Sequence, residues 1–342
     1  MQPRIDNARL LELISGFADL RILVAGDLML DEFIWGRVSR ISPEAPVPVV
    51  NVTGESYYPG GAANVARNLR EFTPQTAVMG LTGRDAAGLR LLELLDAAGI
   101  RTDGVLRDEA AATTVKTRVI ARNQQVVRVD RECPAALSQV QFQQAVQYLE
   151  DTAAVVDGIV VADYGKGFLA QPLADELCRL TRRQSKILTV DPHPHTSLTW
   201  RGATAIKPNR IETFSAAGLP ETPPVEPVCQ DEPLLKAARK LLGLWQTGCL
   251  LVTLGELGML LFNGEAAPVH LPACAHEVFD VSGAGDTAIA VFTLGLIAGA
   301  TPLEAAHLAN RASAIVVGKV GTATVTEAEL MAACQSAPRM PK

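Results

Sequence analysis

A glycine-rich turn followed by an aspartate is the feature of this chain best suited to chemistry. The run Gly283-Ala284-Gly285-Asp286 leads into an apolar stretch, 288–298, that predicts a helix. Glycines let a ligand approach the backbone closely, and a helix N-terminus offers unpaired N–H groups to an anion. A carboxylate beside such a site can take the proton of a hydroxyl while the N–H groups hold a phosphoryl group in transfer. The same residues are compatible with a structural role, in which Asp286 caps a core helix.

Short apolar runs alternate with helical stretches, and polar residues recur where these runs end. Apolar runs predict strands at 21–26, 158–162, 187–190, 203–206 and 250–253. Directly after four of them stand Asp27, Asp163, Asp191 and Lys207-Pro208-Asn209. This alternation is typical of a doubly wound, mostly parallel α/β sheet, in which the carboxyl ends of the strands line one ligand-binding cleft. Asp and Asn also cap helices that follow strands, so a structural interpretation stays open for each of them.

Composition excludes several classes of function. The 342 residues are 48% hydrophobic, which is ample for a large core, and the net charge of −6 disfavours nucleic acid or an anionic membrane as partner. No apolar run reaches the roughly 20 residues of a membrane-spanning helix, and the N-terminus has no signal-peptide pattern. The six cysteines are scattered without a C-x-x-C pair, which argues against a zinc site. We therefore expect a cytoplasmic protein.

Two segments depart from the α/β alternation and predict a small separate β-sheet. Its strands are expected within about 37–53 and 112–131, with a hairpin turn near Asn123. Three cations of the hairpin's first arm share one parity and would lie on one face of a strand, namely Lys116, Arg118 and Arg122. We interpret this sheet as a lid over the cleft whose basic face holds an anionic substrate. A solvated charged face is the alternative.

Four motifs, in order along nearly the whole chain, resemble the signatures of the PfkB, or ribokinase-like, family of carbohydrate kinases. They are GGAANVA at 60–66, GLTGRDAAG at 80–88, NRIE at 209–212 and FDVSGAGDT at 279–287. Each motif alone is weak evidence, whereas all four in this order are specific. The resemblance implies a ribokinase-like fold, with a doubly wound, mostly parallel sheet flanked by helices and a small β-sheet lid. It also implies a single kinase domain over 1–342.

Within that family, the chain looks most like the D-glycero-β-D-manno-heptose-7-phosphate kinases. The likeness rests on GDLMLD at 26–31, SRISPEAPVPV at 39–49 and DYGKG at 163–167. In many bacteria this kinase is the N-terminal half of a bifunctional ADP-heptose synthase. The H-x-G-H motif of the other half does not occur here, so no nucleotidyltransferase domain is predicted. The implied reaction is ATP-dependent phosphorylation of the anomeric C1 hydroxyl of heptose 7-phosphate to the 1,7-bisphosphate, in ADP-heptose (lipopolysaccharide core) biosynthesis.

The resemblance also implies residue roles. Asp286 would be the general base, and the anion hole would be formed by Gly283, Ala284 and Gly285. Mg²⁺ would be organised through water by Asn209 and Glu212, and related kinases bind a monovalent cation such as K⁺ at the positions of Asp280 and Ser282. ATP contacts are expected at Asn209, Thr253, Gly255, Glu256, Gly258 and Asn310. Sugar-phosphate contacts are expected at Asp27, Asp31, Gly60, Gly61, Asn64, Lys116, Arg118, Arg122, Arg128, Asp163, Lys166 and Asp191.

One departure and two alternatives bear on this interpretation. His193 stands where heptose kinases usually carry a lysine, and an imidazole is a weaker, pH-dependent phosphate ligand. The alternatives are a PfkB kinase of another sugar (a hexose phosphate, ribose or a nucleoside), and a catalytically silent module that binds sugar or nucleotide. The exposed edges of the predicted lid favour a homodimer, because such edges are usually paired or covered.

Overall fold

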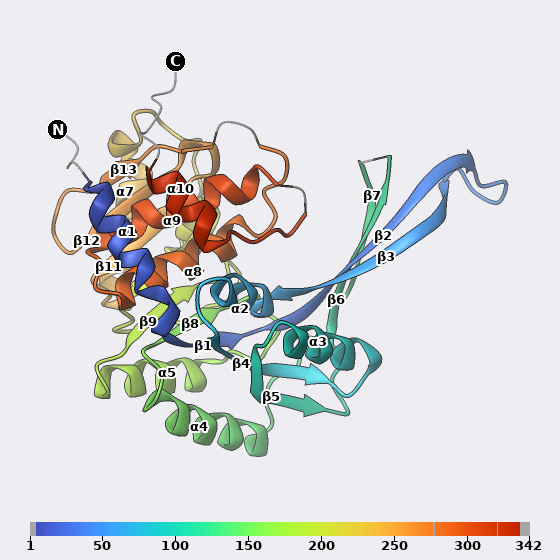
Figure 1. The fold of residues 1–342 in the computed structure, drawn as a ribbon, viewed down its shortest axis with the longest axis horizontal. Coiled ribbons are helices and arrows are strands. Elements are labelled where there is room, and N and C mark those ends of the chain that lie inside the picture. Colours follow the sequence, from blue (N-terminus) through green and yellow to red (C-terminus); the bar gives the residue numbers. More distant parts are fainter. Residues whose placement is uncertain (1–4, 123, 276–277, 320, 336–342) are drawn as a thin grey trace.

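The fold is built on one large sheet with helices on both faces (Figure 1). The computed structural model describes residues 5–122, 124–275, 278–319 and 321–335. The sheet has nine strands in the order β13-β12-β11-β10-β9-β8-β1-β4-β5. Their bounds are β1 Arg21–Gly26, β4 Gln75–Gly83, β5 Arg101–Asp108, β8 Gly158–Ala162, β9 Ile187–Asp191, β10 Ala205–Ile206, β11 Cys249–Thr253, β12 Met259–Asn263 and β13 Val269–Leu271.

All of these strands run in one direction except β12, which is antiparallel to both of its neighbours, so the predicted doubly wound, mostly parallel sheet is confirmed. Strands β1 and β8 have the predicted bounds. Asp191 is the last residue of β9 rather than the residue after it, and β10 is only two residues long. The carboxyl ends of β1, β8, β9 and β10 are neighbours in the sheet, which brings the polar residues at these ends to one edge.

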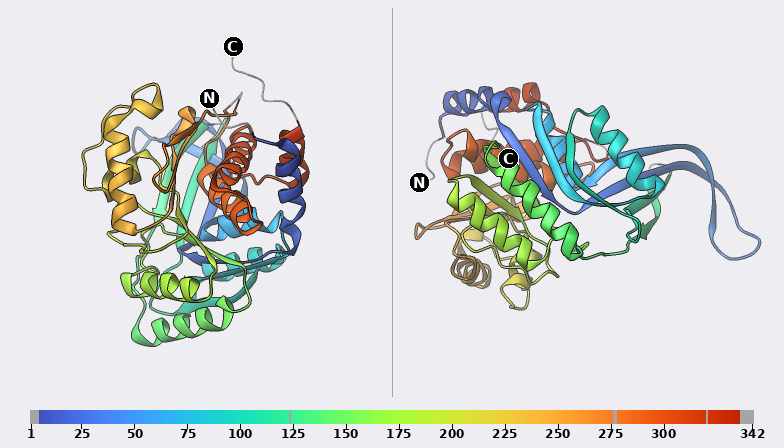
Figure 2. Two further views of the ribbon diagram at one scale, coloured as in Figure 1. Left: turned by 90° about the vertical axis from the view of Figure 1, so that its left-hand side faces the viewer. Right: turned by 90° about the horizontal axis from the view of Figure 1, so that it is seen from below.

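The helices cover the two faces of the sheet (Figure 2). They are α1 Asn7–Ser15, α2 Ala62–Arg70, α3 Ala86–Ala97, α4 Gln139–Ala153, α5 Gln171–Arg183, α6 Arg210–Ala216, α7 Glu232–Trp245, α8 Ala284–Ile297, α9 Pro302–Val317 and α10 Glu327–Gln335, with short 3₁₀ turns at Phe17–Asp19, Val228–Gln230 and Gly255–Leu257. Alternate residues of β1 point to opposite faces, so Ile22 and Val24 join one core with α2 and α8. Leu23 and Ala25 join the other core, with α4, α5 and α7.

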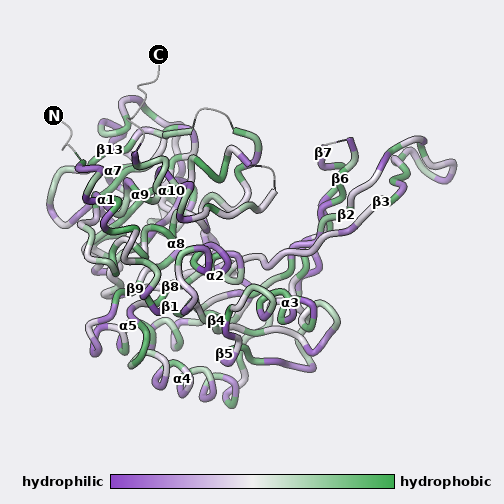
Figure 3. Tube along the Cα trace, viewed as in Figure 1, coloured by the Kyte–Doolittle hydropathy of each residue, from purple (hydrophilic) through white to green (hydrophobic). Residues whose placement is uncertain are grey.

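Helix α8 lies in the middle of the first core. Residues from Asp286 to Gly295 are all buried, as expected for a helix that is apolar all round. The outer helices are instead two-sided, and the turns of α4 that point away from the sheet are hydrophilic (Figure 3). Among the described residues, no helix is both long and apolar enough to cross a membrane.

The second sheet has four strands and extends from the side of the main one (Figure 1). Its order is β3-β2-β6-β7, with bounds β2 Leu28–Ile41, β3 Pro48–Gly61, β6 Thr114–Ala121 and β7 Gln124–Arg131. The expected range 37–53 was therefore too narrow, because β2 and β3 pair all the way from Leu28 opposite Gly61. Pro59 lies within β3, which is an edge strand, where a missing N–H is tolerated. The turn expected at Asn123 lies outside the described residues.

The lid sheet has two chemically different faces. Lys116 pairs with Asp31 and Arg118 with Arg128 across neighbouring strands, so all four side chains lie on one face. The predicted alignment of Arg122 with them was wrong. Strand β6 ends at Ala121, and Arg122 lies in the following turn with a φ of 50°. The opposite face carries three apolar residues that pair across neighbouring strands, namely Ile34, Val119 and Val127.

Candidate active site

Asp286 is buried in the first turn of α8, and its carboxylate is held by two side chains. Asn64 Nδ2 donates to one oxygen at 2.6 Å, and the Tyr164 hydroxyl donates to the other. The residue that caps the helix is Gly283, whose φ of 80° suits glycine. A Cβ at Gly283 would also lie 3.1 Å from Asn64 Nδ2. The interpretation of Asp286 as a helix cap is therefore wrong.

The surroundings of Asp286 suit a general base. Burial raises the pKa of Asp286 to about 6, while the hydrogen bonds from Tyr164 and Asn64 act in the opposite direction. Asp191 raises this pKa further and Lys207 lowers it. The carboxylate is thus ionised at neutral pH and has a pKa close to the range in which proton transfer is efficient.

The turn before Asp286 offers fewer free N–H groups than the sequence suggested. Ala284 N–H donates to the Val281 carbonyl at 3.3 Å, so one predicted anion-hole donor is used within the turn. Gly285 and Asp286 lie in the first turn of α8, where N–H groups have no intrahelical acceptor. A Cβ at Gly285 would lie 3.6 Å from Lys207 Nζ. A lysine therefore lies close to these donors.

Lys207 was not predicted as a site residue. It follows β10, its side chain is only 4% exposed, and its Nζ is 2.9 Å from Asp191 Oδ1. Burial opposes a charge on Lys207, but the carboxylates of Asp191 and Glu212 outweigh burial and raise its pKa. It is therefore a buried cation beside the glycine-rich turn. Its place at the carboxyl end of a parallel strand, directly before the NRIE motif, was the signal in the sequence.

Asn209 and Glu212 form a closed local pair at the start of α6. Asn209 accepts from the Glu212 N–H at 2.9 Å, and the Glu212 carboxylate accepts from the Asn209 N–H and Nδ2, both at 2.7 Å. Burial raises the pKa of Glu212, and Lys207 opposes this shift. A single fixed carboxylate fits Mg²⁺ that keeps most of its water, as this ion usually does. No cluster of three ligating side chains occurs among the described residues, so direct coordination by the protein alone is not supported.

The predicted nucleotide segment lies beside this pair. Thr253 at the end of β11 donates its N–H to the Pro208 carbonyl at 2.9 Å and bridges to Asn209. Gly255 and Glu256 follow in a 3₁₀ turn, which Gly258 ends with a φ of 86°. The fold thus brings these residues next to the NRIE motif.

Two other predicted ligands are engaged within the protein. Asn310 Nδ2 donates to the Pro272 carbonyl at 2.8 Å, and so ties α9 to the segment before the glycine-rich turn. Asp280 accepts from the Ser282 N–H at 2.9 Å and from the Gly321 N–H at 3.2 Å. Both side chains therefore hold loops in place, and their roles toward nucleotide and monovalent cation stay predictions.

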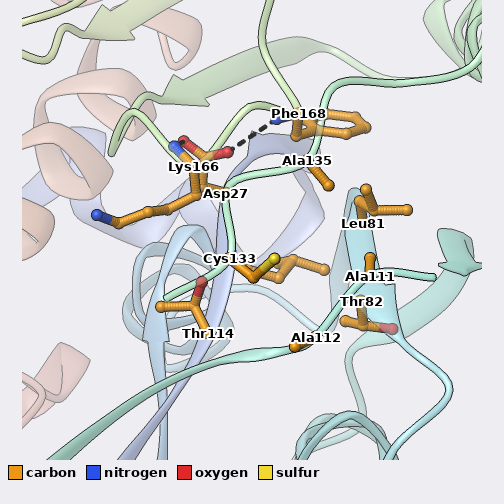
Figure 4. A pocket seen from close by; sticks show the side chains of 11 residues that line it. Asp27, Leu81, Thr82, Ala111, Ala112, Thr114, Cys133, Ala135, Lys166 and Phe168 are labelled. Carbon is orange, nitrogen blue, oxygen red and sulfur yellow. Dashed lines mark hydrogen bonds between the residues drawn. The ribbon is translucent and has the colours of Figure 1, made fainter. Parts of the chain in front are cut away.

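Asp27 holds a loop rather than standing free for a sugar. Its carboxylate accepts from the Tyr164 N–H at 2.9 Å. It also accepts from the N–H groups of Lys166 at 3.1 Å and Phe168 at 3.2 Å (Figure 4). Asp163 likewise accepts from the Gly165 N–H at 2.9 Å. The cavity below Asp27 in Figure 4 measures about 20 Å³, which leaves room for one water molecule.

The root of the lid carries Asp31 and the two glycines of β3. Asp31 pairs with Arg118 at 2.6 Å, and both side chains are largely buried. A Cβ at Gly60 would lie 2.7 Å from Asp31 Oδ2, and Gly61 has a φ of 58°. The glycines are therefore needed where β3 passes Asp31 and turns into α2, the helix that carries Asn64.

The cations of the lid differ in how they are paired. Lys166 Nζ is 2.8 Å from Glu132, and Arg128 pairs with Asp130 at 2.9 Å. Lys116 makes no ion pair within the described part of the chain. Burial lowers the pKa of Lys116, and the nearby Lys166 lowers it further. Two ammonium groups thus lie close enough to repel each other.

His193 belongs to the same neighbourhood. A Cβ at Gly165 would lie 3.0 Å from His193 Nδ1, so the ring packs against the loop that carries Lys166. Burial lowers the pKa of His193, as do His195 and Lys166. The residue that replaces the usual lysine therefore adds a neutral imidazole rather than a third cation near neutral pH.

Comparison with known proteins agrees with this geometry. Residues 20–329 match the family described as pfkB family carbohydrate kinase. Bifunctional protein HldE of Desulfatibacillum aliphaticivorans is 44% identical over 325 residues, which are 95% of this chain and 65% of that protein. Bifunctional protein HldE of Geobacter sulfurreducens is 41% identical over 312 residues, with 91% and 62% covered. The chain thus spans less than two thirds of the length of these relatives.

Solved structures share the fold. Arabidopsis thaliana ribokinase complexed with ribose and ATP superposes with a TM-score of 0.71 at 17% identity, covering 93% of this chain and 99% of that one. Phosphofructokinase-2 of Escherichia coli in complex with substrates and products has a TM-score of 0.71 at 19% identity, covering 92% and 98%. The predicted ribokinase-like fold is therefore confirmed. The chain belongs to the pfkB family of carbohydrate kinases and is a sugar kinase.

Proposed function

We propose that this sugar kinase phosphorylates the anomeric C1 hydroxyl of D-glycero-β-D-manno-heptose 7-phosphate with ATP, giving the 1,7-bisphosphate, in ADP-heptose biosynthesis. The observation that carries the chemistry is the buried carboxylate of Asp286 at the N-terminus of α8, with its pKa of about 6. The heptose assignment rests on the motifs that resemble heptose kinases and on the similarity to proteins named HldE.

In this mechanism Asp286 takes the proton of the C1 hydroxyl as its oxygen bonds to the γ-phosphorus of ATP. The bond from that phosphorus to the β–γ bridging oxygen breaks, and ADP leaves. The N–H groups of Gly285 and Asp286 and the ammonium of Lys207 stabilise the charge on the transferred group. Glu212 would hold Mg²⁺ through water, and the ion would neutralise charge on the ATP phosphates. Thr253 to Gly258 would line the nucleotide.

For the substrate's own phosphate, we propose Lys116 and Lys166 as the binding pair. They repel each other in the absence of an anion, and a phosphate between them removes this repulsion. Arg118 is engaged with Asp31, and Arg122 lies in the turn at the end of the hairpin. Lys166 would give up Glu132 as its partner, or share it.

We propose that 1–342 acts as one kinase domain and forms a homodimer through the lid. Val127 and Val129 are each 47% exposed on the apolar face of the lid, and β3 and β7 leave open sheet edges. A second copy of the chain would cover both. Light scattering tests this directly, since a dimer mass is expected and a monomer at micromolar concentration contradicts it.

ADP release with Mg²⁺-ATP tests the proposed reaction. The acceptors are D-glycero-β-D-manno-heptose 7-phosphate, fructose 6-phosphate, ribose and adenosine. We expect selective turnover of the heptose phosphate, with the new phosphate at C1 by ³¹P NMR. Preference for another acceptor contradicts the heptose assignment but leaves the role of Asp286 intact. If only an unphosphorylated sugar is turned over, the lid cations do not bind a substrate phosphate and belong to a solvated charged surface.

A further inference from the structure

We propose that Tyr164 is a positioning residue for the catalytic base, and that Asp27 acts through Tyr164 rather than on the sugar. The inference rests on the proposed role of Asp286 as base. Tyr164 lies in the loop after β8, and its hydroxyl donates to the Asp286 carboxylate across 122 residues of sequence. The residue roles implied by the family resemblance include Asp163 and Lys166 of this loop but not Tyr164.

The two hydrogen bonds to Asp286 fix the orientation of its carboxylate. Tyr164 donates to Oδ1 and Asn64 to Oδ2, so rotation of the carboxylate would break both bonds. Each carboxylate oxygen still has a further lone pair. The substrate hydroxyl can therefore donate to a carboxylate whose direction is already set, which is the requirement for efficient proton transfer.

The loop that carries Tyr164 is itself fixed from below. Asp27, directly after β1, accepts from the N–H groups of Tyr164, Lys166 and Phe168. Tyr164 thus bonds to Asp27 through its backbone and to Asp286 through its side chain. Gly165 and Gly167 have φ values of 66° and 101°, which allow the tight winding of this loop around one carboxylate. This geometry explains why the DYGKG run has a glycine on each side of Lys166.

The electrostatics keep Tyr164 a donor. Burial and the carboxylate of Asp286 raise the pKa of Tyr164 well above its usual range, so the phenol stays protonated. The other groups that face Asp286 are Asn64 on α2, Asp191 on β9 and Lys207 after β10. A donor to an ionised carboxylate favours its charged form, so losing the phenol raises the pKa of Asp286.

The test is Tyr164→Phe, which keeps the ring and the backbone bond to Asp27. We expect kcat to fall roughly tenfold to a hundredfold with the KM for ATP unchanged. The acidic limb of the kcat–pH profile should move up by about one pH unit. Tyr148→Phe on α4 removes a phenol far from the site and is the matched control. An unshifted limb, or a loss of kcat equal in both variants, overturns the proposal.

A second measurement separates this inference from the heptose assignment. The pH profiles use whichever acceptor the wild type turns over best, so a different preferred sugar contradicts only the substrate. In addition, ¹³C NMR of aspartate-labelled protein without substrate follows the Asp286 carboxyl directly, with Asp286→Asn identifying its signal. We expect the midpoint of this titration to be higher in Tyr164→Phe than in the wild type. Equal midpoints show that Tyr164 does not act on the base.

Discussion

The base side of the site and the lid side both carry charged residues, but they hold them differently. Around Asp286 the charged groups are buried and are fixed by partners from other parts of the chain; Lys207, for example, is 4% exposed and bound to Asp191. On the lid, Arg128 is 51% exposed and pairs with Asp130, two residues further along the same strand. The side chains around Asp286 are fixed before substrate arrives, whereas those on the lid can rearrange.

This contrast has an energetic consequence. A buried charge that loses its partner is strongly destabilising, whereas an exposed ion pair contributes at most about 1 kcal/mol. Substitutions on the base side should therefore reduce stability or turnover by large factors. Substitutions on the lid should change substrate binding and little else. The predictions that follow test this division from its strongest point to its weakest.

Asp286→Asn should give the largest loss of activity. Without a base, turnover should fall by at least the ~10²–10⁴-fold typical of a positioned acid–base group, because the variant keeps the shape but cannot accept the proton. ADP release under saturating ATP and sugar measures it. Asp151→Asn, an exposed carboxylate on α4, is the control and should leave turnover unchanged. Near-normal turnover of Asp286→Asn would remove Asp286 from the mechanism.

The base side also shows how far the sequence alone could go. The proposed base, Asp286, and the glycines before it stand in one short motif, so their proximity follows from chain connectivity. The position of Lys207 and Tyr164 after strands places them at the sheet edge, but their partners, Asp191 and Asp286, are supplied only by the fold. Asp27 shows the opposite limit, because a carboxylate after a strand looks the same in sequence whether it binds a sugar or three backbone N–H groups.

The main sheet was easier to predict than the lid for a related reason. Strands buried on both faces appear as continuous apolar runs, and β1 and β8 were predicted to the residue. The lid strands are exposed and carry charges, a proline and glycines, so no run marks their ends. Their length comes from pairing between β2 and β3, which is a tertiary property.

Lys207→Met should cause the largest loss of stability. It leaves the buried carboxylates of Asp191 and Glu212 without their cation, and the free energy of unfolding should fall by about 3–5 kcal/mol. Urea unfolding followed by circular dichroism measures it. Lys236→Met on α7 replaces an exposed lysine and should change stability by less than about 0.5 kcal/mol.

A double variant separates the two effects of Lys207. Lys207→Met with Asp191→Asn should recover much of the lost stability, because the second change removes the uncompensated charge. Turnover should stay low, since the cation beside the glycine-rich turn is still absent. Full recovery of turnover in the double variant would mean that Lys207 serves the fold alone.

The pKa of Asp286 predicts a pH effect on stability with a definite sign. The folded pKa of about 6 lies above the unfolded value of 3.8, so the folded state binds the extra proton between these values. This carboxyl therefore increases the free energy of unfolding as pH falls from 6 to 4. Above pH 6 its ionised form destabilises the folded state. Relative to Asp286→Asn, the wild type should gain up to about 3 kcal/mol between pH 8 and pH 4. A constant difference across this range would contradict the raised pKa.

Activity should follow the same titration in the opposite sense. The base works only when ionised, so wild-type kcat/KM should fall by half near pH 6 and continue to fall below it. The conditions that relieve the buried charge are thus those that remove function.

The lid gives the smallest and most selective effects. Lys116→Met should raise the KM for a phosphorylated sugar roughly tenfold and leave kcat and the KM for ATP nearly unchanged, because it removes one of two cations from the proposed phosphate site. Arg128→Met is the matched variant on the same face, where the cation is exposed and already paired, and its KM should change less than about twofold. Initial-rate kinetics on both variants measure this. Equal KM values for the two variants would show that the lid face acts as a diffuse positive surface. A fall in kcat for Lys116→Met would mean that the lid side chains, like those around Asp286, are fixed in place before substrate binds.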